Sequence, residues 1–154
     1  MIHGAQAQAD EIASLAGAGH HVVLCPRSNS RFGFTRAPVA AFRQAGVPLA
    51  LGTDSLASSP SLSLWDELAF AREWFGGALA PADWLEIATA GGAATLGLGG
   101  RLGRLAAGLE ASFQVVAVPV GACAADLAEA LCAGGEHVVV QALYLGGENV
   151  LPLP

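Results

Sequence analysis

Two stretches decide the fold: residues 21–29 read HVVLCPRSN, and residues 47–55 read VPLALGTDS. Each begins with a short apolar run and passes directly into polar residues. The apolar runs do not alternate with polar residues, which is typical of strands buried on both faces of a parallel sheet. In such sheets the reactive residues lie just past the carboxyl ends of the strands. The two stretches therefore predict a parallel β/α array with polar groups along one edge.

The segments around these strands predict helices and complete the α/β pattern. Helices are expected over residues 5–18, over residues 39–45 after a proline, and from a serine cap at Ser61 or Ser63 to residue 74. Residues 27–36 have the composition of a loop. The repeated order of strand, loop and helix is that of a parallel β/α unit.

A different rhythm begins after residue 80. Residues 81–90 and 93–98 predict two short helices separated by a Gly-Gly pair, and the turn-rich stretch 97–112 marks a boundary. Beyond it we expect a strand at 113–118, a helix at 124–133, a strand at 137–145 and a glycine hairpin at 146–147. We therefore divide the chain into a β/α part, residues 1–105, and a smaller β-rich part, residues 106–154.

Composition excludes several classes of protein. The 154 residues are 53% hydrophobic and 13% charged, with a net charge of −6 and no lysine, so a nucleic-acid-binding surface is not expected. Glycine, proline or charge interrupts every apolar run before the roughly 20 residues that a membrane helix needs. The first residues do not form a signal peptide, and three cysteines make no even disulfide set, so a cytoplasmic protein is expected. The small polar surface predicts apolar faces that favour association.

Three polar positions follow the predicted strands and carry the candidate chemistry. His3 follows the stub Met1-Ile2, the segment Arg27-Ser28-Asn29 follows the first strand, and Asp54 follows the second. A carboxylate at such a place can ligate a divalent metal or take a proton from water, and a histidine can orient that water. By spacing alone, the sequence around Asp54 is also that of a turn capping the next helix. His3 alone likewise carries no specific signal.

Other residues have structural and functional readings side by side. Cys25 precedes a proline at a strand end with no paired base, which favours a buried packing role over a nucleophile. For Cys123 and Cys132, a packing role is favoured over metal binding. For the three tryptophans, a packing role is favoured over the stacking of bases. Phe32 and Phe34 could line the mouth of a site for an aromatic substrate.

The order of the motifs adds a resemblance to a known family. His3-Gly4, Cys25-Pro26-Arg27-Ser28-Asn29 and Leu51-Gly52-Thr53-Asp54-Ser55 occur in that order, followed by ATAGGAA at 88–94 and GRL at 103–105. Over about residues 1–118 the chain resembles the amidohydrolase superfamily, in its branch of cytosine and guanine deaminases, chlorohydrolases and adenosylhomocysteine deaminases. The arginine of the CPRSN motif and the sequence DSLAS after it are also similar to aminofutalosine deaminases.

The resemblance implies a fold, a reaction and residue roles. The family fold is a TIM-type (β/α)8 barrel beside a small β-sandwich, and its reaction is hydrolysis by metal-activated water. Asp54 matches the aspartate after strand eight, which touches the metal and shuttles the proton. His3 matches the histidine after strand six, which helps polarise the substrate or hold the hydroxide. Arg27 to Asn29 match the substrate-binding loop after strand seven. The implied substrate is a small molecule such as an aromatic amine or a nucleobase.

The resemblance also implies what the chain lacks. The family's His-x-His after strand one and the histidine after strand five, which hold zinc or iron, have no counterpart here. The chain is therefore expected to be the end of strand six through strand eight plus part of the sandwich (residues 1–105 and 106–154). It would belong to a longer protein or a truncated gene, be inactive and metal-free alone, and need a complementary N-terminal half. The alternative is a non-catalytic remnant or interaction fragment that binds no metal.

Overall fold

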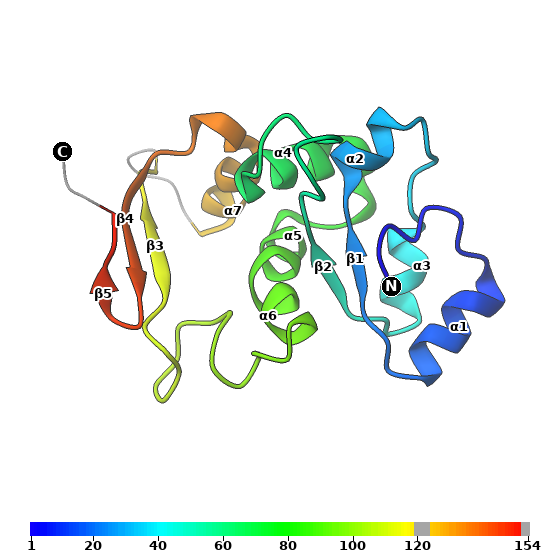
Figure 1. The fold of residues 1–154 in the computed structure, drawn as a ribbon, viewed down its shortest axis with the longest axis horizontal. Coiled ribbons are helices and arrows are strands. Elements are labelled where there is room, and N and C mark those ends of the chain that lie inside the picture. Colours follow the sequence, from blue (N-terminus) through cyan, green and yellow to red (C-terminus); the bar gives the residue numbers. More distant parts are fainter. Residues whose placement is uncertain (119–123, 152–154) are drawn as a thin grey trace.

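The computed structural model describes residues 1–118 and 124–151 and contains two separate sheets (Figure 1). The strands are β1 (Val22–Leu24), β2 (Leu49–Leu51), β3 (Phe113–Val116), β4 (Val140–Leu145) and β5 (Glu148–Asn149). The α-helices are α1 (Ala9–Gly17), α2 (Pro26–Arg31), α3 (Val39–Gln44), α4 (Leu64–Phe75), α5 (Pro81–Glu86), α6 (Gly92–Thr95) and α7 (Ala124–Gly134). Short 3-10 turns lie at Gly76–Ala78 and Gly135–His137, and a π-helical turn lies at Ile87–Gly91.

The first sheet is parallel, as the two opening stretches predict. β1 and β2 pair in parallel with Val22 opposite Leu49 and Leu24 opposite Leu51. A further parallel bridge joins Ile2 to Val23, so the first residues of the chain lie on the other side of β1. The carboxyl ends of these three segments therefore reach the same edge of the sheet.

The core forms where the helices pack on this sheet. All three residues of β2 are buried, and Val22 and Leu24 of β1 are fully enclosed. α1 and α3 lie on one side of the strands in Figure 1, and α5 and α6 lie on the other. The largest fully buried side chains include Trp84, Phe42 and Leu68, contributed by α5, α3 and α4. The predicted packing role of Trp84 is confirmed.

The structure decides which serine caps α4, and it corrects the prediction of a loop at residues 27–36. α4 begins at Leu64, and the hydroxyl of the preceding Ser63 accepts a hydrogen bond from the Asp66 N–H at 3.2 Å, so Ser63 rather than Ser61 is the cap. The segment 27–36, expected to be a loop, instead starts with the six-residue helix α2. The proline at position 26 supplies the fixed φ that suits a first helical residue, a signal that the polar composition of the segment obscured.

The predicted break between the helices of residues 81–98 is wrong. α5, the π-helical turn and α6 follow one another without interruption, and Gly91 has helical φ and ψ of −63° and −44°. A β-carbon built on Gly91 would collide with the carbonyl oxygen of Leu49. Gly91 is therefore a point of close contact between helix and strand, because only glycine lets the helix lie directly on β2.

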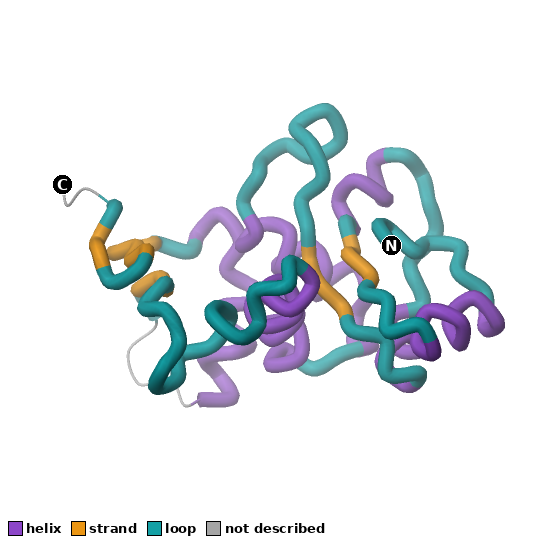
Figure 2. The backbone as a smooth tube through the Cα atoms, turned by 60° about the horizontal axis from the view of Figure 1, so that its bottom comes forward, coloured by secondary structure: helices purple, strands orange, loops and turns teal. Residues whose placement is uncertain are grey.

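The second sheet is antiparallel, with β4 between β3 and β5. Figure 2 shows its strands apart from β1 and β2. β3 ends at Val116 and β4 begins at Val140, so both are shorter than the predicted strands 113–118 and 137–145. His137 lies in a 3-10 turn instead of a strand. The glycine hairpin is confirmed, since Gly146 and Gly147 join β4 to β5 and both have positive φ.

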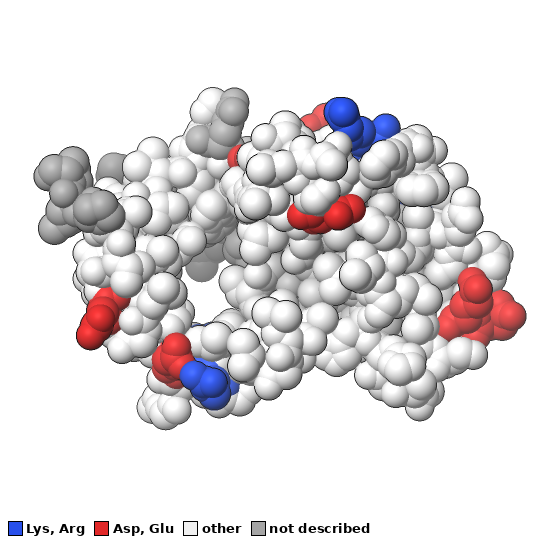
Figure 3. Space-filling model, viewed as in Figure 1, with Lys and Arg blue, Asp and Glu red and all other residues white. Residues whose placement is uncertain are grey.

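The surface carries few charges, as the composition indicates. Most of the face in Figure 3 shows no charged side chain. Several large apolar side chains are exposed, among them Met1, Ile2, Phe32 and Leu56. None of the described helices is both long enough and apolar enough to cross a membrane.

Substitution of Gly91 tests the contact between helix and strand. We expect Gly91→Ala to lower the free energy of unfolding by about 1–3 kcal/mol, because the new methyl group overpacks against Leu49. The measurement is urea unfolding followed by circular dichroism.

Gly92→Ala is the matched control. Gly92 is also helical, and a β-carbon there has no neighbour within 4 Å. Alanine at this position is expected to leave stability unchanged or to raise it by up to about 1 kcal/mol. Equal effects of the two substitutions would contradict the assigned contact.

Candidate active site

His3 and Asp54 meet at the carboxyl-terminal edge of the parallel sheet. The Nε2 atom of His3 lies 3.8 Å from the Oδ2 atom of Asp54, and the two side chains are 37% and 33% exposed. The His3 N–H donates to the carbonyl of Val23 at 2.8 Å, which fixes the residue beside β1. Nδ1 of His3 is buried and finds no hydrogen-bond partner among the described residues. An imidazole and a carboxylate so arranged can hold, accept and donate a proton.

Both residues have a strained backbone. His3 and Asp54 are the non-glycine residues with positive φ in the described part of the chain, at 70° and 60°. This conformation costs on the order of 1–3 kcal/mol for each residue, and such strain concentrates at functional sites. At His3 the strain comes from a tight turn in which the Gly4 N–H donates to the Ile2 carbonyl at 3.0 Å. The backbone thus singles out the same two residues that sequence reasoning selected.

Ser28 joins this pair from α2. Its side chain is fully buried, and its hydroxyl donates a 2.7 Å hydrogen bond to Oδ2 of Asp54. The same Oδ2 atom therefore accepts the hydrogen bond from Ser28 and faces the imidazole of His3. The bond orients the carboxylate of Asp54, since a hydroxyl donor from a buried helix restricts where the oxygen can lie.

Arg27 uses its side chain differently from the role the sequence suggests. Its side chain is 8% exposed, and its guanidinium lies 3.2 Å from Glu67 and 3.4 Å from Asp66 on α4. It also donates to the Ser59 hydroxyl at 2.6 Å and to the Ser61 carbonyl at 2.9 Å. These contacts occupy the guanidinium within the protein, so a substrate-binding role for Arg27 stays a prediction and receives no geometric support.

Glu67 is the buried partner of Arg27. Its side chain has no exposed surface, and burial raises the pKa of its carboxyl, while the Arg27 N–H and guanidinium act in the opposite direction. Nothing in the sequence selected Glu67, because an acidic residue in the first turn of a helix is the ordinary complement to the helix dipole.

Asn29 and the two phenylalanines lie on α2 and just after it. Asn29 is 2% exposed, and its Oδ1 has no hydrogen-bond partner among the described residues. Phe32 and Phe34 are exposed, with ring centroids 6.3 Å apart and planes tilted by 57°. Their contact with a substrate stays a prediction.

Of the remaining histidines and cysteines that the structure describes, only Cys25 neighbours this cluster. Cys25 is buried beside it, and burial together with the Asp54 and Glu67 carboxylates raises its thiol pKa to about 12. Cys132 is also buried, with a pKa raised by burial to about 11. His21 contacts the Thr95 hydroxyl at 2.9 Å, which is a structural role. Cys123 lies outside the described residues.

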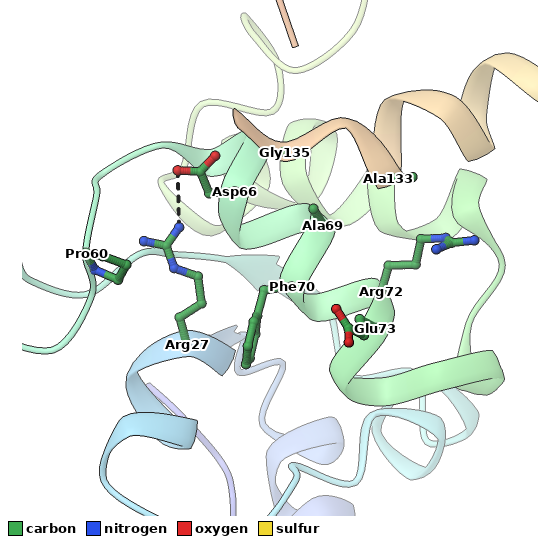
Figure 4. Close-up of a pocket in the computed structure, with 9 residues that line it drawn as sticks. All are labelled: Arg27, Pro60, Asp66, Ala69, Phe70, Arg72, Glu73, Ala133 and Gly135. Carbon is green, nitrogen blue, oxygen red and sulfur yellow. Dashed lines mark ion pairs between the residues drawn. The ribbon is translucent and has the colours of Figure 1, made fainter. Parts of the chain in front are cut away.

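A surface groove lies elsewhere. It has a volume of about 520 Å³ and runs between α4 and the end of α7. Figure 4 shows that Arg27 and Asp66 face each other at one end of it, and that Phe70 and Arg72 lie farther along. Neither His3 nor Asp54 lines the groove. The groove therefore does not coincide with the candidate active site.

The described residues supply part of a metal site. The imidazole of His3 and the carboxylate of Asp54 are donors of the kind that zinc and iron accept. No group of three or more His, Cys, Asp or Glu residues able to hold an ion occurs within residues 1–118 and 124–151. A tight zinc site takes at least three protein ligands, so these residues do not complete one.

Comparison with known proteins identifies the class. The sequence model of the amidohydrolase family matches residues 1–150, and the chain belongs to this family. The 5-methylthioadenosine/S-adenosylhomocysteine deaminase of Halobacterium salinarum is 42% identical over 122 residues, which are 75% of this chain and 28% of that protein. The aminodeoxyfutalosine deaminase of Deinococcus radiodurans is 40% identical over 97 residues, 63% of this chain and 23% of that protein. The resemblance carried by the motifs is confirmed.

A solved structure shares the fold. An adenosine deaminase from Xanthomonas campestris, solved with bound zinc, has a TM-score of 0.87 at 31% identity and covers 97% of this chain. The chain covers 36% of that structure and 28% or less of the two deaminases above. The fold is therefore that of one portion of a TIM-barrel-type amidohydrolase.

The buried thiols give a test of the environment of the site. Because the pKa of Cys25 rises from 9.0 to about 12, its thiolate fraction at pH 8 falls about 10³-fold, and the thiolate is the reactive form. We expect no carboxamidomethylation of Cys25 or Cys132 by iodoacetamide in the folded chain, measured for each cysteine by mass spectrometry. The control is the same reaction in urea, where both should react. Labelling of Cys25 at the unfolded rate would refute this environment.

Proposed function

We propose that this chain is the carboxyl-terminal portion of a metal-dependent amidohydrolase that hydrolyses non-peptide C–N bonds, and that it is inactive alone. The observation that carries the proposal is the meeting of His3 and Asp54 at the ends of parallel strands, both with positive φ. Family membership and the deaminase relatives support the class of reaction.

The proposal assigns the elements to a barrel. The segment at Ile2 is the end of barrel strand six, β1 is strand seven and β2 is strand eight, while β3 to β5 form part of the sandwich. The parallel order of Ile2, β1 and β2 supports this assignment, since consecutive barrel strands are neighbours. The first five to six strands and the other metal ligands would come from a complementary segment.

Three side chains of this chain would carry its share of the chemistry. Asp54 would accept a proton from the attacking water and return it to the leaving amine. Ser28 would hold Oδ2 of Asp54 in place through its 2.7 Å hydrogen bond. His3 would donate to the oxygen on which negative charge develops. Asp54 would also be one ligand of the family's zinc or iron.

The substrate is proposed to be a small aromatic amine of the nucleobase type. Relatives named as deaminases of adenosine derivatives support this class. The exposed pair of Phe32 and Phe34, two turns beyond the start of α2, offers apolar rings to a planar substrate. Asn29 is assigned to substrate binding by its motif alone, because its side chain is buried, with 2% of the residue exposed.

Metal content tests the incomplete site. The 154-residue chain alone is expected to bind zinc or iron only at substoichiometric levels, because two donors hold such ions weakly. Elemental analysis of the purified chain, with Asp54→Ala beside it, makes the measurement. Stoichiometric metal in the chain that is lost in Asp54→Ala would contradict the proposal that the chain is inactive alone. It would indicate that two copies of the chain together complete the metal site.

Complementation tests the catalytic role of Asp54. The chain is co-expressed with the N-terminal part of the Xanthomonas campestris deaminase, which ends just before the segment that matches residue 1 of this chain. The measurement is the deamination of adenosine. We expect near-stoichiometric metal and activity in the complex, with a loss in kcat on the order of 10²–10⁴-fold for Asp54→Asn. Asp10→Asn, an exposed residue of α1, is the matched control and should retain activity.

The complementation experiment also decides against the other candidate. A complex that forms but holds no metal and deaminates nothing would overturn the catalytic proposal and support a non-catalytic remnant or interaction fragment. Full activity in Asp54→Asn would leave the class of protein unchanged and remove Asp54 from the mechanism.

A further inference from the structure

Glu67 is buried in α4 and contacts one residue at two points. Its Oε1 atom accepts a 2.9 Å hydrogen bond from the backbone N–H of Arg27, and its Oε2 atom lies 3.2 Å from the Nε atom of the same residue. The side chain of Glu67 has no exposed surface, and that of Arg27 is 8% exposed. A carboxylate therefore holds both the backbone and the side chain of Arg27.

The backbone contact falls where α2 needs an acceptor. The first N–H groups of a helix have no partner within the helix. Cys25, the residue at the cap position of α2, makes no side-chain capping bond, and Pro26 has no N–H. The Arg27 N–H is thus the first donor of α2, and Glu67 accepts it from a different helix. Glu67 performs the capping that the sequence before α2 does not provide.

Ser28, the next residue of α2, contacts the candidate active site. Its hydroxyl donates to Oδ2 of Asp54 at 2.7 Å, and the same oxygen lies 3.8 Å from His3. We propose that Glu67 is a positioning residue, which fixes the first turn of α2 through Arg27 and thereby sets the hydrogen bond from Ser28 to Asp54. The consequence for catalysis rests on the proposed function, whereas the effect on Ser28 and Asp54 does not.

The contacts around the guanidinium strengthen this assignment. Ser59 and Ser61, from the loop between β2 and α4, accept hydrogen bonds from it, and Asp66 lies 3.4 Å away. The loop that follows Asp54 and the helix after that loop are therefore both tied to Arg27. A displacement of Arg27 would move Ser28 and would also loosen the loop that begins at Asp54.

A purely stabilising role explains the pair less well. Burying two charges costs desolvation free energy, and apolar pairs of similar volume are often equally stable or more stable. An apolar pair cannot accept the Arg27 N–H. What Glu67 supplies beyond packing is a fixed acceptor for one backbone atom next to Ser28, and this is the property that the test isolates.

The test uses the 154-residue chain and amide hydrogen exchange followed by NMR. The double variant Arg27→Met with Glu67→Met removes the buried charges together, so folding is retained. We expect the exchange of the residue 27 amide to accelerate at least about tenfold, and the amide signals of Ser28 and Asp54 to shift. Glu67→Gln keeps a carbonyl acceptor and should retain most of the protection at residue 27. The control is Glu73→Gln on the exposed face of α4, which should leave all three residues unchanged.

Two results would overturn the proposal. One is unchanged protection at residue 27 in the double variant, which would show that Glu67 is not the acceptor. The other is loss of that protection with unshifted signals of Ser28 and Asp54, which would show that the contact does not position them. Both readings come from the chain alone, so they do not depend on whether the complemented enzyme is active.

A kinetic measurement in the complemented deaminase adds the catalytic readout. We expect the double variant to lower kcat at least about tenfold while KM changes less than about twofold, because Ser28 and Asp54 act in the chemical step. Glu67→Gln should recover most of kcat. If Asp54→Asn loses activity and the double variant retains full activity, the positioning role of Glu67 is refuted and the proposed function is not. Activity in Asp54→Asn would refute the role of Asp54 and leave the NMR result to decide the contact.

Discussion

The parallel pairing of β1 with β2 is the constraint on which the candidate site depends. Because the strands run in the same direction, Leu24 and Leu51 end at one edge, and the polar residues after them have to share that edge. The bridge from Ile2 to Val23 brings His3 to the same place. Three segments far apart in the sequence thus converge without any long-range covalent link. The helices determine how firmly this pairing is held, above all where Gly91 lies against Leu49.

Sequence patterns predicted the elements that carry this convergence and missed details decided by tertiary contacts. Unbroken apolar runs indicated buried parallel strands, and the polar residues after the strand segments indicated His3, the segment Arg27-Ser28-Asn29 and Asp54. The helix through Gly91 was not predictable from local propensity, since a Gly-Gly pair normally interrupts a helix. Its reason lies in a strand about forty residues earlier in the chain, and no local pattern contains that information.

The direction of the Arg27 side chain was likewise decided by distant residues. From the motif alone, an arginine at the mouth of a site is a plausible ligand for a substrate. The structure surrounds its guanidinium with partners from α4 and the preceding loop. Glu67 explains why that direction is favoured, because a fully buried carboxylate needs a cationic partner and hydrogen-bond donors close by. A motif residue can therefore matter through its backbone and through the residue that follows it.

Strain at His3 and Asp54 bears on why this geometry persists in so small a portion of a barrel. Two non-glycine residues with positive φ lower the stability of a chain that already exposes apolar side chains such as Ile2 and Phe32. Packing alone gives no reason to keep both, since neither side chain belongs to the buried core. The contacts that hold them are those of the His3 N–H to β1 and of Ser28 to Asp54. Under the proposed function, the strain has its reason in a site that these residues form with the rest of an amidohydrolase barrel.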